Sequence, residues 1–183
     1  MATPIVTLER ATPDSAALLE NLLALYMHDM SEIFPVEPGP DGRFVYGHLP
    51  AYWSEPGTRY AFLIRSGVTV VGFALIVRGS PATTEPSDLD VAEFFVLRGH
   101  RRSGVGRVAA FALWDLLPGS WVVRVSEANR AGIPFWSEIV REYTNGAFAE
   151  GGWPGRATGW RVFGFASRAG GPVTQARGES AMR

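Results

Sequence analysis

The sequence predicts one mixed α/β domain, in which helices flank a mostly antiparallel sheet with a central parallel strand–helix–strand crossover. The first support is the order of apolar segments, which runs strand, helix, hairpin, strand, helix, strand, helix, strand. The second is the hairpin beside a strand–helix–strand unit, which implies a mixed sheet with a right-handed crossover. The third is the length of 183 residues, which suits one domain with a sizeable core.

The first part of the chain predicts a strand followed by a helix. Residues 4–12 are rich in β-branched side chains and predict the opening strand. Proline, aspartate and serine at 13–15 are typical of a helix start, and apolar residues at helical spacing extend the predicted helix over 16–34. Proline and glycine interrupt the aromatic segment 35–56, so we expect a loop with one short helix there.

The middle of the chain predicts a β-hairpin. Two apolar, β-branched segments, 59–67 and 69–79, are separated by a tight turn around Ser66 and Gly67. A polar loop follows before the next apolar segment begins.

The remaining elements alternate between strand and helix. Residues 91–97 and 121–125 are short apolar strands, and 104–117 is a helix with its apolar residues on one face. A second amphipathic helix is predicted over 131–143, where proline is tolerated because it lies in the first turn. Residues 159–167 predict a closing strand.

We expect residues 1–167 to form the domain and the small, polar tail 168–183 to be disordered. The chain contains neither cysteine nor lysine, which excludes disulfides, thiolate metal ligands, a cysteine nucleophile, Schiff-base catalysis and a Walker lysine. We expect no metal site. The net charge of −1 gives no general attraction to nucleic acid or to a membrane surface. No apolar run is long enough to cross a bilayer, and the N-terminus lacks a signal-peptide pattern, so we expect a cytoplasmic monomer or homodimer.

The segment FFVLRGHRRSGVGR, residues 94–107, joins a predicted strand to a predicted helix. The first amides of a helix have no acceptors within it and carry a partial positive charge. Glycines at 104 and 106 allow a ligand to approach the backbone, and arginines add forked donors that suit phosphate oxygens. These features together favour a site for a pyrophosphate group over the alternative of a basic surface loop.

A dinucleotide is one alternative ligand for this segment. Residues 104–109 fit a loose dinucleotide fingerprint, and Glu127 follows at about the required spacing of ~20 residues. However, the dinucleotide turn normally follows its strand directly, whereas RGHRRS intervenes here. The chain also lacks a second set of parallel strand–helix repeats, so this alternative is less favoured.

A resemblance to a known family narrows the choice. RRSGVG at 101–106 resembles the R/Q-x-x-G-x-G/A signature of the GNAT superfamily of N-acetyltransferases, and it lies between the family's fourth strand and third helix. The segment departs from the family pattern at Arg98, where proline is usual, at His100, where an aromatic is usual, and at Arg102, where a small residue is usual.

A second match follows downstream. EANRAGIPFW at 127–136 is similar to the family's N-x-x-A-x-x-F-Y/W element at the start of the fourth helix, with Gly132 where alanine is common. The order of strands and helices is also that of the family. The resemblance is specific over residues 93–136 and architectural over the first 80 residues.

The resemblance implies that the chain binds acetyl-coenzyme A. In the family, amides after the signature arginine hold the pyrophosphate, the fourth strand pairs with the pantetheine arm, and an asparagine contacts that arm from the far side. Asn129 could equally cap the following helix, and the two aromatics beside it could be core residues. Carried over by position, the coenzyme-binding residues are Phe94, Phe95, Val96, Arg101, Arg102, Ser103, Gly104, Val105, Gly106, Arg107, Asn129, Phe135 and Trp136.

Glu93 is the candidate general base for acetyl transfer to an amine. An alkylamine is protonated near neutral pH, so proton removal assists its attack on the thioester. Glu93 stands in an otherwise apolar strand, where family members often carry a carboxylate, and burial would raise its pKa. The alternative is an outward-facing strand residue. We expect the amide of Phe95 or Val96 to stabilise the oxyanion.

The sequence leaves the general acid unassigned. Trp136 occupies the position where many family members place a tyrosine near the sulfur, and an indole N–H is not a useful acid. Tyr143, Ser126, Ser137 and solvent are other options. This departure keeps a second hypothesis open, a non-catalytic module that binds acyl-coenzyme A.

The acceptor is expected to be a small-molecule or peptide amine. In the family it is held by the first helices and the loop between them, where this chain offers carboxylates among aromatic side chains. Such a mixture suits a cationic amine. The candidate acceptor-binding residues are Tyr26, Asp29, Glu32 and Trp53, although a solvated helix end explains the two carboxylates equally well.

Overall fold

The computed structural model describes residues 4–154 and 159–168. Except for Arg168, the tail expected to be disordered lies outside the described residues. Within the described part of the chain, no helix is long and apolar enough to cross a membrane.

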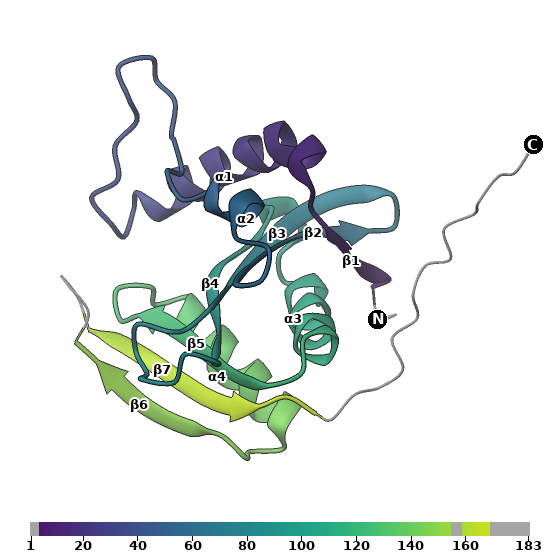
Figure 1. Cartoon of the computed structure of the whole chain (residues 1–183), viewed down its shortest axis with the longest axis vertical. Helices are drawn as coiled ribbons and strands as arrows, with labels where there is room; N and C mark the ends of the chain where they lie inside the picture. Colours follow the sequence, from purple (N-terminus) through teal and green to yellow (C-terminus); the bar gives the residue numbers. More distant parts are fainter. Residues whose placement is uncertain (1–3, 155–158, 169–183) are drawn as a thin grey trace, which may run out of the picture.

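The described strands form one seven-stranded sheet in the order β1-β2-β3-β4-β5-β7-β6 (Figure 1). The pairing of β4 with β5 is parallel, and the other five strand pairs of this sheet are antiparallel. The predicted fold class is therefore confirmed. The strands are β1 (Val6–Arg10), β2 (Arg59–Ser66), β3 (Thr69–Arg78), β4 (Leu89–Val96), β5 (Ser120–Ser126), β6 (Ala149–Trp153) and β7 (Trp160–Ala166).

Helices cover both faces of the sheet, as Figure 1 shows. On one face, α1 (Ala16–Met30) and α2 (Ala51–Ser54) bury a cluster that includes Leu19 and Phe73. On the other face, α3 (Val105–Leu116) and α4 (Gly132–Thr144) enclose an aromatic core built around Trp114. Two 3-10 turns, η1 (Pro13–Ser15) and η2 (Arg98–His100), precede α1 and follow β4.

Most predicted elements are found with ends shifted by one or two residues, and two differences are larger. Helix α1 ends at Met30 rather than at 34, and residues 31–34 form turns in front of Pro35, which disfavours helical backbone in the residue before it. Strand β6 was not predicted, because AEGGW carries no alternating apolar pattern. It lies at the sheet edge and pairs with β7 alone.

An irregularity in β4 opens the sheet near its centre. Leu75 pairs with Glu93 but Ile76 pairs with Val91, so Ala92 is an extra residue in β4. Such a bulge bends its strand and increases the local twist. The pairing of β4 with β5 ends at Val91 and Val123. Beyond this point the two strands part and leave a wedge-shaped gap between them.

Candidate active site

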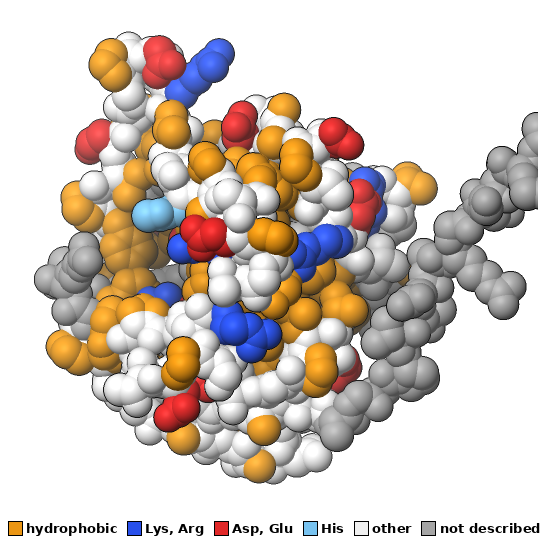
Figure 2. Space-filling view, in the orientation of Figure 1, with side chains coloured by type: hydrophobic (Ala, Val, Ile, Leu, Met, Phe, Trp, Pro, Cys, Tyr) orange, Lys and Arg blue, Asp and Glu red, His pale blue; other side chains and the backbone are white. Residues whose placement is uncertain are grey.

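A cavity of about 340 Å³ lies where β4 and β5 part. Its walls come from the end of α1, the segment after α1, the parted strands, and the beginnings of α4 and β7. In the space-filling view this face is hollowed at its left side, among hydrophobic side chains (Figure 2). The lining residues used below are Tyr26, Met27, Met30, Phe34, Val36, Tyr46, Glu93, Phe94, Arg124, Ser126, Asn129, Trp136 and Trp160.

The bulge decides which way Glu93 points. Val91 packs into the core beneath α3 and α4. In a regular strand Glu93 would lie on that same face, since side chains repeat every second residue. The extra residue at Ala92 shifts Glu93 to the opposite face, opposite Leu75, where α1 covers the sheet. Glu93 therefore enters the cavity instead of the aromatic core.

Two tyrosines hold the Glu93 carboxylate. The Tyr26 hydroxyl donates to Oε2, and the Tyr46 hydroxyl donates to Oε1 at 2.9 Å. Tyr26 comes from α1 and Tyr46 from the segment before α2, so three distant parts of the chain meet at one carboxylate.

The electrostatics of this cluster suit proton transfer. Burial raises the pKa of Glu93 above its ordinary value, and the hydrogen bonds from Tyr26 and Tyr46 only partly offset this. Burial and the neighbouring carboxylate raise the pKa of both tyrosines, so they stay protonated and act as donors. A carboxylate with a raised pKa at the floor of a cavity can accept a proton and release it again.

The gap also exposes backbone groups of β4. The Leu97 amide donates to the Val71 carbonyl at 2.8 Å, so by alternation the backbone of residue 95 bonds to β3. A Cβ added to Gly72 in β3 would lie 2.0 Å from the Phe95 carbonyl oxygen, which agrees with a Phe95 carbonyl that points toward β3. The backbone groups of Phe94 and Val96 consequently face the gap. The amides of Phe95 and Val96 were both expected to stabilise an oxyanion. The Val96 amide points into the gap, whereas the Phe95 amide points toward β3.

Two residues of the loop between β4 and α3 have left-handed backbone conformations. Gly104 directly precedes α3 with φ +87°, and Arg102 has φ +61°, which a residue with a side chain rarely adopts. Backbone strain of this kind is concentrated at functional sites. The first-turn amides of α3 lie just beyond, without acceptors inside the helix.

Glycine is required at positions 104 and 106 for different structural reasons. Gly104 is required by its backbone conformation, while a Cβ at Gly106 would lie 3.2 Å from Cζ of Phe135. Gly106 therefore lets α3 approach α4 closely. Phe135 also lies near Phe94 of β4, with ring centroids 6.4 Å apart. Gly106 of α3 and Phe135 of α4 thus both lie beside Phe94, which lines the gap.

Two of the loop arginines are ion-paired to α1. Arg98 donates to Asp29 Oδ1 at 2.7 Å, and Arg101 donates to Asp29 Oδ2 at 2.6 Å and to the Val96 carbonyl at 2.7 Å. Partial burial acts to raise the pKa of Asp29, but these hydrogen bonds and charges outweigh it and lower that pKa. Asp29, expected to bind the acceptor, instead connects α1 to the loop after β4.

A third arginine is also ion-paired, and a fourth is not. Arg107 binds Glu142 of α4 through both ends of its guanidinium, with Nε 2.6 Å from Oε2. Arg102 is exposed and has no acidic partner within the described part of the chain. Arginine side chains gather across the middle of the face drawn in Figure 2. Of the loop arginines, Arg102 can contact a phosphate without breaking an ion pair.

Asn129 both caps α4 and lines the cavity. Its Oδ1 accepts a hydrogen bond from the Gly132 amide at 2.8 Å, which leaves the side-chain NH₂ group as a donor. A Cβ at residue 132 would lie 2.6 Å from Asn129 Nδ2, which explains glycine at this position. Trp136 of the same helix is 8% exposed and lines the cavity.

The other candidates for the acceptor site lie outside the cavity. Glu32 is exposed in the turn after α1, and Trp53 packs against the core beneath α1 and α2. Tyr143, one option for the general acid, donates to Asp115 at 2.7 Å and lies in the aromatic core away from the cavity. Burial and the hydrogen bond to Asp115 raise the pKa of Tyr143 to about 12. Ser126 does line the cavity.

Sequence reasoning missed a buried ion pair in the cavity wall. Arg124 of β5 binds Asp90 of β4 through two hydrogen bonds of 2.7 and 2.9 Å, and Ser80 also donates to Asp90. The Asp90 side chain is 0% exposed, and the guanidinium lies 5.5 Å from the ring centroid of Trp160. An arginine inside the apolar strand WVVRV was the available signal, because a buried charge requires a partner.

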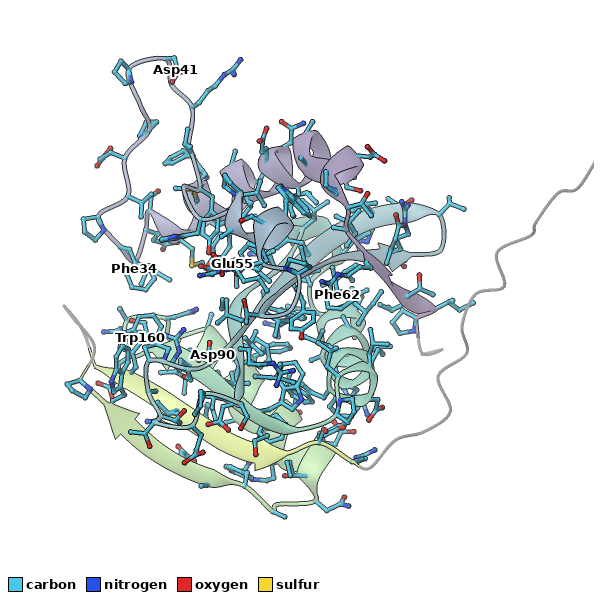
Figure 3. The ribbon with its side chains drawn as sticks, in the orientation of Figure 1. Phe34, Asp41, Glu55, Phe62, Asp90 and Trp160 are labelled. Carbon is cyan, nitrogen blue, oxygen red and sulfur yellow. The ribbon has the colours of Figure 1, made fainter. Side chains whose placement is uncertain are left out.

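An aromatic pair forms part of the cavity wall. Phe34 and Trp160 stack with ring centroids 6.0 Å apart and an interplanar angle of 15°. Figure 3 shows the two side chains pointing toward one another from the segment after α1 and from β7. They are 126 positions apart in the sequence, and no local pattern predicts their contact.

We compared the chain with known proteins. No family model and no curated protein matches the chain. An acetyltransferase from Thermus thermophilus has the same fold, with a TM-score of 0.67, 22% identity, and coverage of 90% of this chain and 100% of that one.

Two further solved structures agree. An aminoglycoside acetyltransferase in complex with coenzyme A has a TM-score of 0.65 and 14% identity, covering 88% of this chain and 95% of that one. Spermidine N-acetyltransferase from Vibrio cholerae, in complex with coenzyme A and spermine, has a TM-score of 0.58 and 13% identity over the same shares. The chain thus has the fold of N-acetyltransferases, as the sequence resemblance implied.

Proposed function

We propose that this protein is an acetyl-coenzyme A-dependent N-acetyltransferase that acetylates a primary amine. The observation that carries the proposal is the convergence of two features on one gap in the sheet. The start of α3 lies beside the gap, since a Cβ at Gly106 would lie 3.8 Å from Phe94 in the gap wall. The floor of the gap holds Glu93 between two tyrosine hydroxyls. The shared fold, with coenzyme A bound in two of the similar structures, supports the same conclusion.

The residues present fit the coenzyme. The amides of residues 102–107 and the Arg102 side chain would hold the pyrophosphate, because helix-start amides and guanidinium groups suit phosphate oxygens. The gap-facing backbone of Phe94 and Val96 would pair with the amides of the pantetheine arm. Asn129 would donate from its free NH₂ group across the gap. The coenzyme supplies an activated acetyl thioester.

Glu93 acts on the acceptor. An ammonium group that enters the cavity loses a proton to the Glu93 carboxylate, directly or through water, and the free amine attacks the thioester carbonyl carbon. The Val96 amide stabilises the oxyanion. When the carbon–nitrogen bond forms and the carbon–sulfur bond breaks, the nitrogen would release its second proton. That proton would reach the leaving thiolate through solvent or through the Ser126 hydroxyl. Tyr26 and Tyr46 keep the carboxylate in place and favour its charged form.

A non-catalytic acyl-coenzyme A-binding module is the second candidate function. The observation that favours it is Trp136, which lines the cavity where a tyrosine acid is common in similar enzymes. Dinucleotide binding is less favoured, because the described sheet contains one parallel strand pair and no second strand–helix repeat beside it.

Two measurements test the proposal. A thermal-shift comparison of acetyl-coenzyme A with NADPH should show stabilisation by the thioester alone, since a ligand that binds only the folded state raises its melting temperature. Thiol release from acetyl-coenzyme A should then depend on an added amine. Stabilisation without amine-dependent release would favour the binding module, and stabilisation by NADPH alone would overturn the proposal.

A further inference from the structure

We infer that the acceptor is a monoamine with an apolar body, such as an arylalkylamine, rather than a polyamine, an aminoglycoside or a charged peptide. This inference rests on the proposed function and narrows its substrate class. It follows from the number of charges in the cavity, the chemistry of its walls and its size.

The cavity offers one place for a cation. Among the described residues that line it, Glu93 and Arg124 are the only charged ones. Arg124 forms an ion pair with Asp90 through two hydrogen bonds, so the Asp90 carboxylate is already occupied and cannot serve a second ammonium group. Asp29 is bound to Arg98 and Arg101, and Glu32 is exposed outside the cavity. Glu93 can therefore receive one ammonium group, and a second would find no carboxylate among these walls.

The wall beyond Glu93 is apolar. Met27 and Met30 from the last turn of α1 face the cavity together with Phe34, Val36 and Trp160. A second ammonium placed against this wall would lose its hydration and gain no carboxylate, which carries a substantial free-energy cost. The ring of Trp160, whose face attracts cations, already lies 5.5 Å from the Arg124 guanidinium. Thioether and aromatic groups instead favour a flat apolar body.

The size of the cavity restricts the acceptor further. Its 340 Å³ lies at the lower end of the ~300–1,000 Å³ typical of small-molecule sites. The same space must hold the acetyl group and the end of the pantetheine arm, because Val91, Phe94 and Val125 of the parted strands also line it. The stacked Phe34 and Trp160 form part of its wall. The space that remains beside Glu93 therefore favours a small acceptor over a multi-ring polycation.

The reaction remains balanced for such a substrate. The ammonium group gives up two protons and gains the acetyl group as an amide. One proton passes through Glu93 to solvent, and the other converts the leaving thiolate to the free thiol of coenzyme A. No co-reactant beyond the thioester is needed.

The first test compares amines that differ in charge and body. Thiol release would be measured with 2-phenylethylamine, spermidine, kanamycin and a lysine-containing peptide, and binding of each to the protein loaded with coenzyme A would be measured by calorimetry. We expect 2-phenylethylamine to have a kcat/KM at least about tenfold above each of the others, the scale of one unpaired buried polar group.

The outcomes separate this inference from the function on which it rests. Equal or higher kcat/KM for spermidine, kanamycin or the peptide would overturn the inference and leave acetyl transfer standing. Binding of 2-phenylethylamine to the loaded protein without turnover would support the inference and overturn the proposed catalysis. If 2-phenylethylamine neither binds to the loaded protein nor is acetylated, the inference is overturned.

A second test changes the charge of the wall. Pentylamine and 1,5-diaminopentane have equal chain lengths and differ by one ammonium group, so their kcat/KM ratio measures tolerance of a second charge. Met30→Glu, which adds a carboxylate to the apolar wall, should move this ratio toward the diamine by about tenfold or more. Leu18→Glu, on the same helix but 39% exposed and outside the cavity, should leave the ratio unchanged.

Val36→Asp repeats the test from the segment after α1, and decides the matter if Met30→Glu does not fold. An unchanged ratio in a folded variant at either position, or the same change in Leu18→Glu, would overturn the assignment of this wall to the acceptor body.

Discussion

The two halves of the candidate site are built on different principles. The proposed coenzyme half is contiguous in sequence, since the end of β4, the loop and the start of α3 fall within residues 94–107. The proposed acceptor half assembles α1, the segment before α2, β4, β5 and β7 around one cavity. The first half offers mainly backbone amides to its ligand, and the second offers side chains.

This difference determines which substitutions each half of the site can tolerate. A backbone site depends on torsion angles and on the absence of side chains, as at Gly104 and Gly106. A side-chain site depends on which residues meet, so single substitutions change its specificity without disturbing the backbone. Asp29 connects the halves, because it lies on α1 and binds Arg98 and Arg101 of the loop.

The largest expected effect comes from Glu93→Gln. We expect kcat to fall by about 10²–10⁴, the usual contribution of positioned proton transfer, with an unchanged Kd for acetyl-coenzyme A. Steady-state kinetics and calorimetry would measure the two quantities. Glu20→Gln, an exposed change on α1, is the matched control and should affect neither. Equal loss of turnover and coenzyme affinity would remove Glu93 from the proton-transfer role.

Gly104→Val should act on the other half. A β-branched residue is strained at φ +87°, so the loop should rearrange and the Kd for acetyl-coenzyme A should rise by about tenfold, from ~1–3 kcal/mol of strain. Gly146→Val is the control, because Gly146 has φ +85° after α4, outside the proposed site. A similar loss of affinity in both variants would show a general effect of strain and contradict the proposed role of the loop.

Tyr46→Phe tests the hydrogen bonds to Glu93. The Tyr46 hydroxyl stabilises the charged carboxylate and lowers its pKa, so its removal raises the pKa of Glu93. The acidic limb of the kcat/KM profile should then move to higher pH, with little change at alkaline pH. Tyr60→Phe is the control, since that hydroxyl donates to the Gly57 carbonyl outside the cavity. A limb that stays in place or moves to lower pH would contradict this assignment.

Asp29→Asn should have the smallest effect. Loss of the ion pairs with Arg98 and Arg101 should lower Tm by at most about 2–4 °C at neutral pH, because ion pairs with exposed arginines contribute little to stability. The pKa of Asp29 is lower in the folded state, so this stability is present above the unfolded value near ~3.9 and is lost as pH falls through the folded value. The Tm difference from the wild type should therefore vanish in acid, which melting curves across pH would measure. A difference that grows in acid would contradict the ion-pair account.

The contiguous half was largely predictable from the sequence. The strand, the glycine-containing loop and the helix start were all indicated by local patterns, and α3 was placed within one residue at each end. Glu93 also stood out as a carboxylate in an apolar strand. Its direction was not predictable, because the bulge at Ala92 arises from pairing with β3 and reverses the face on which Glu93 lies.

The assembled half required the folded chain. Asp29 looked like an acceptor ligand in the sequence, but its partners lie about 70 positions away and neutralise it. The contact between Phe34 and Trp160 and the hydrogen bonds from Tyr26 and Tyr46 to one carboxylate depend on packing between distant elements. Local patterns carry no information about such contacts.

A crystal structure of the protein with acetyl-coenzyme A is the most direct test. We predict the diphosphate on the backbone nitrogens of residues 102–107 and the acetyl carbonyl in the gap beside Val96, with the acceptor cavity between it and Glu93. A diphosphate bound elsewhere, or a thioester directed away from Glu93, would contradict the account.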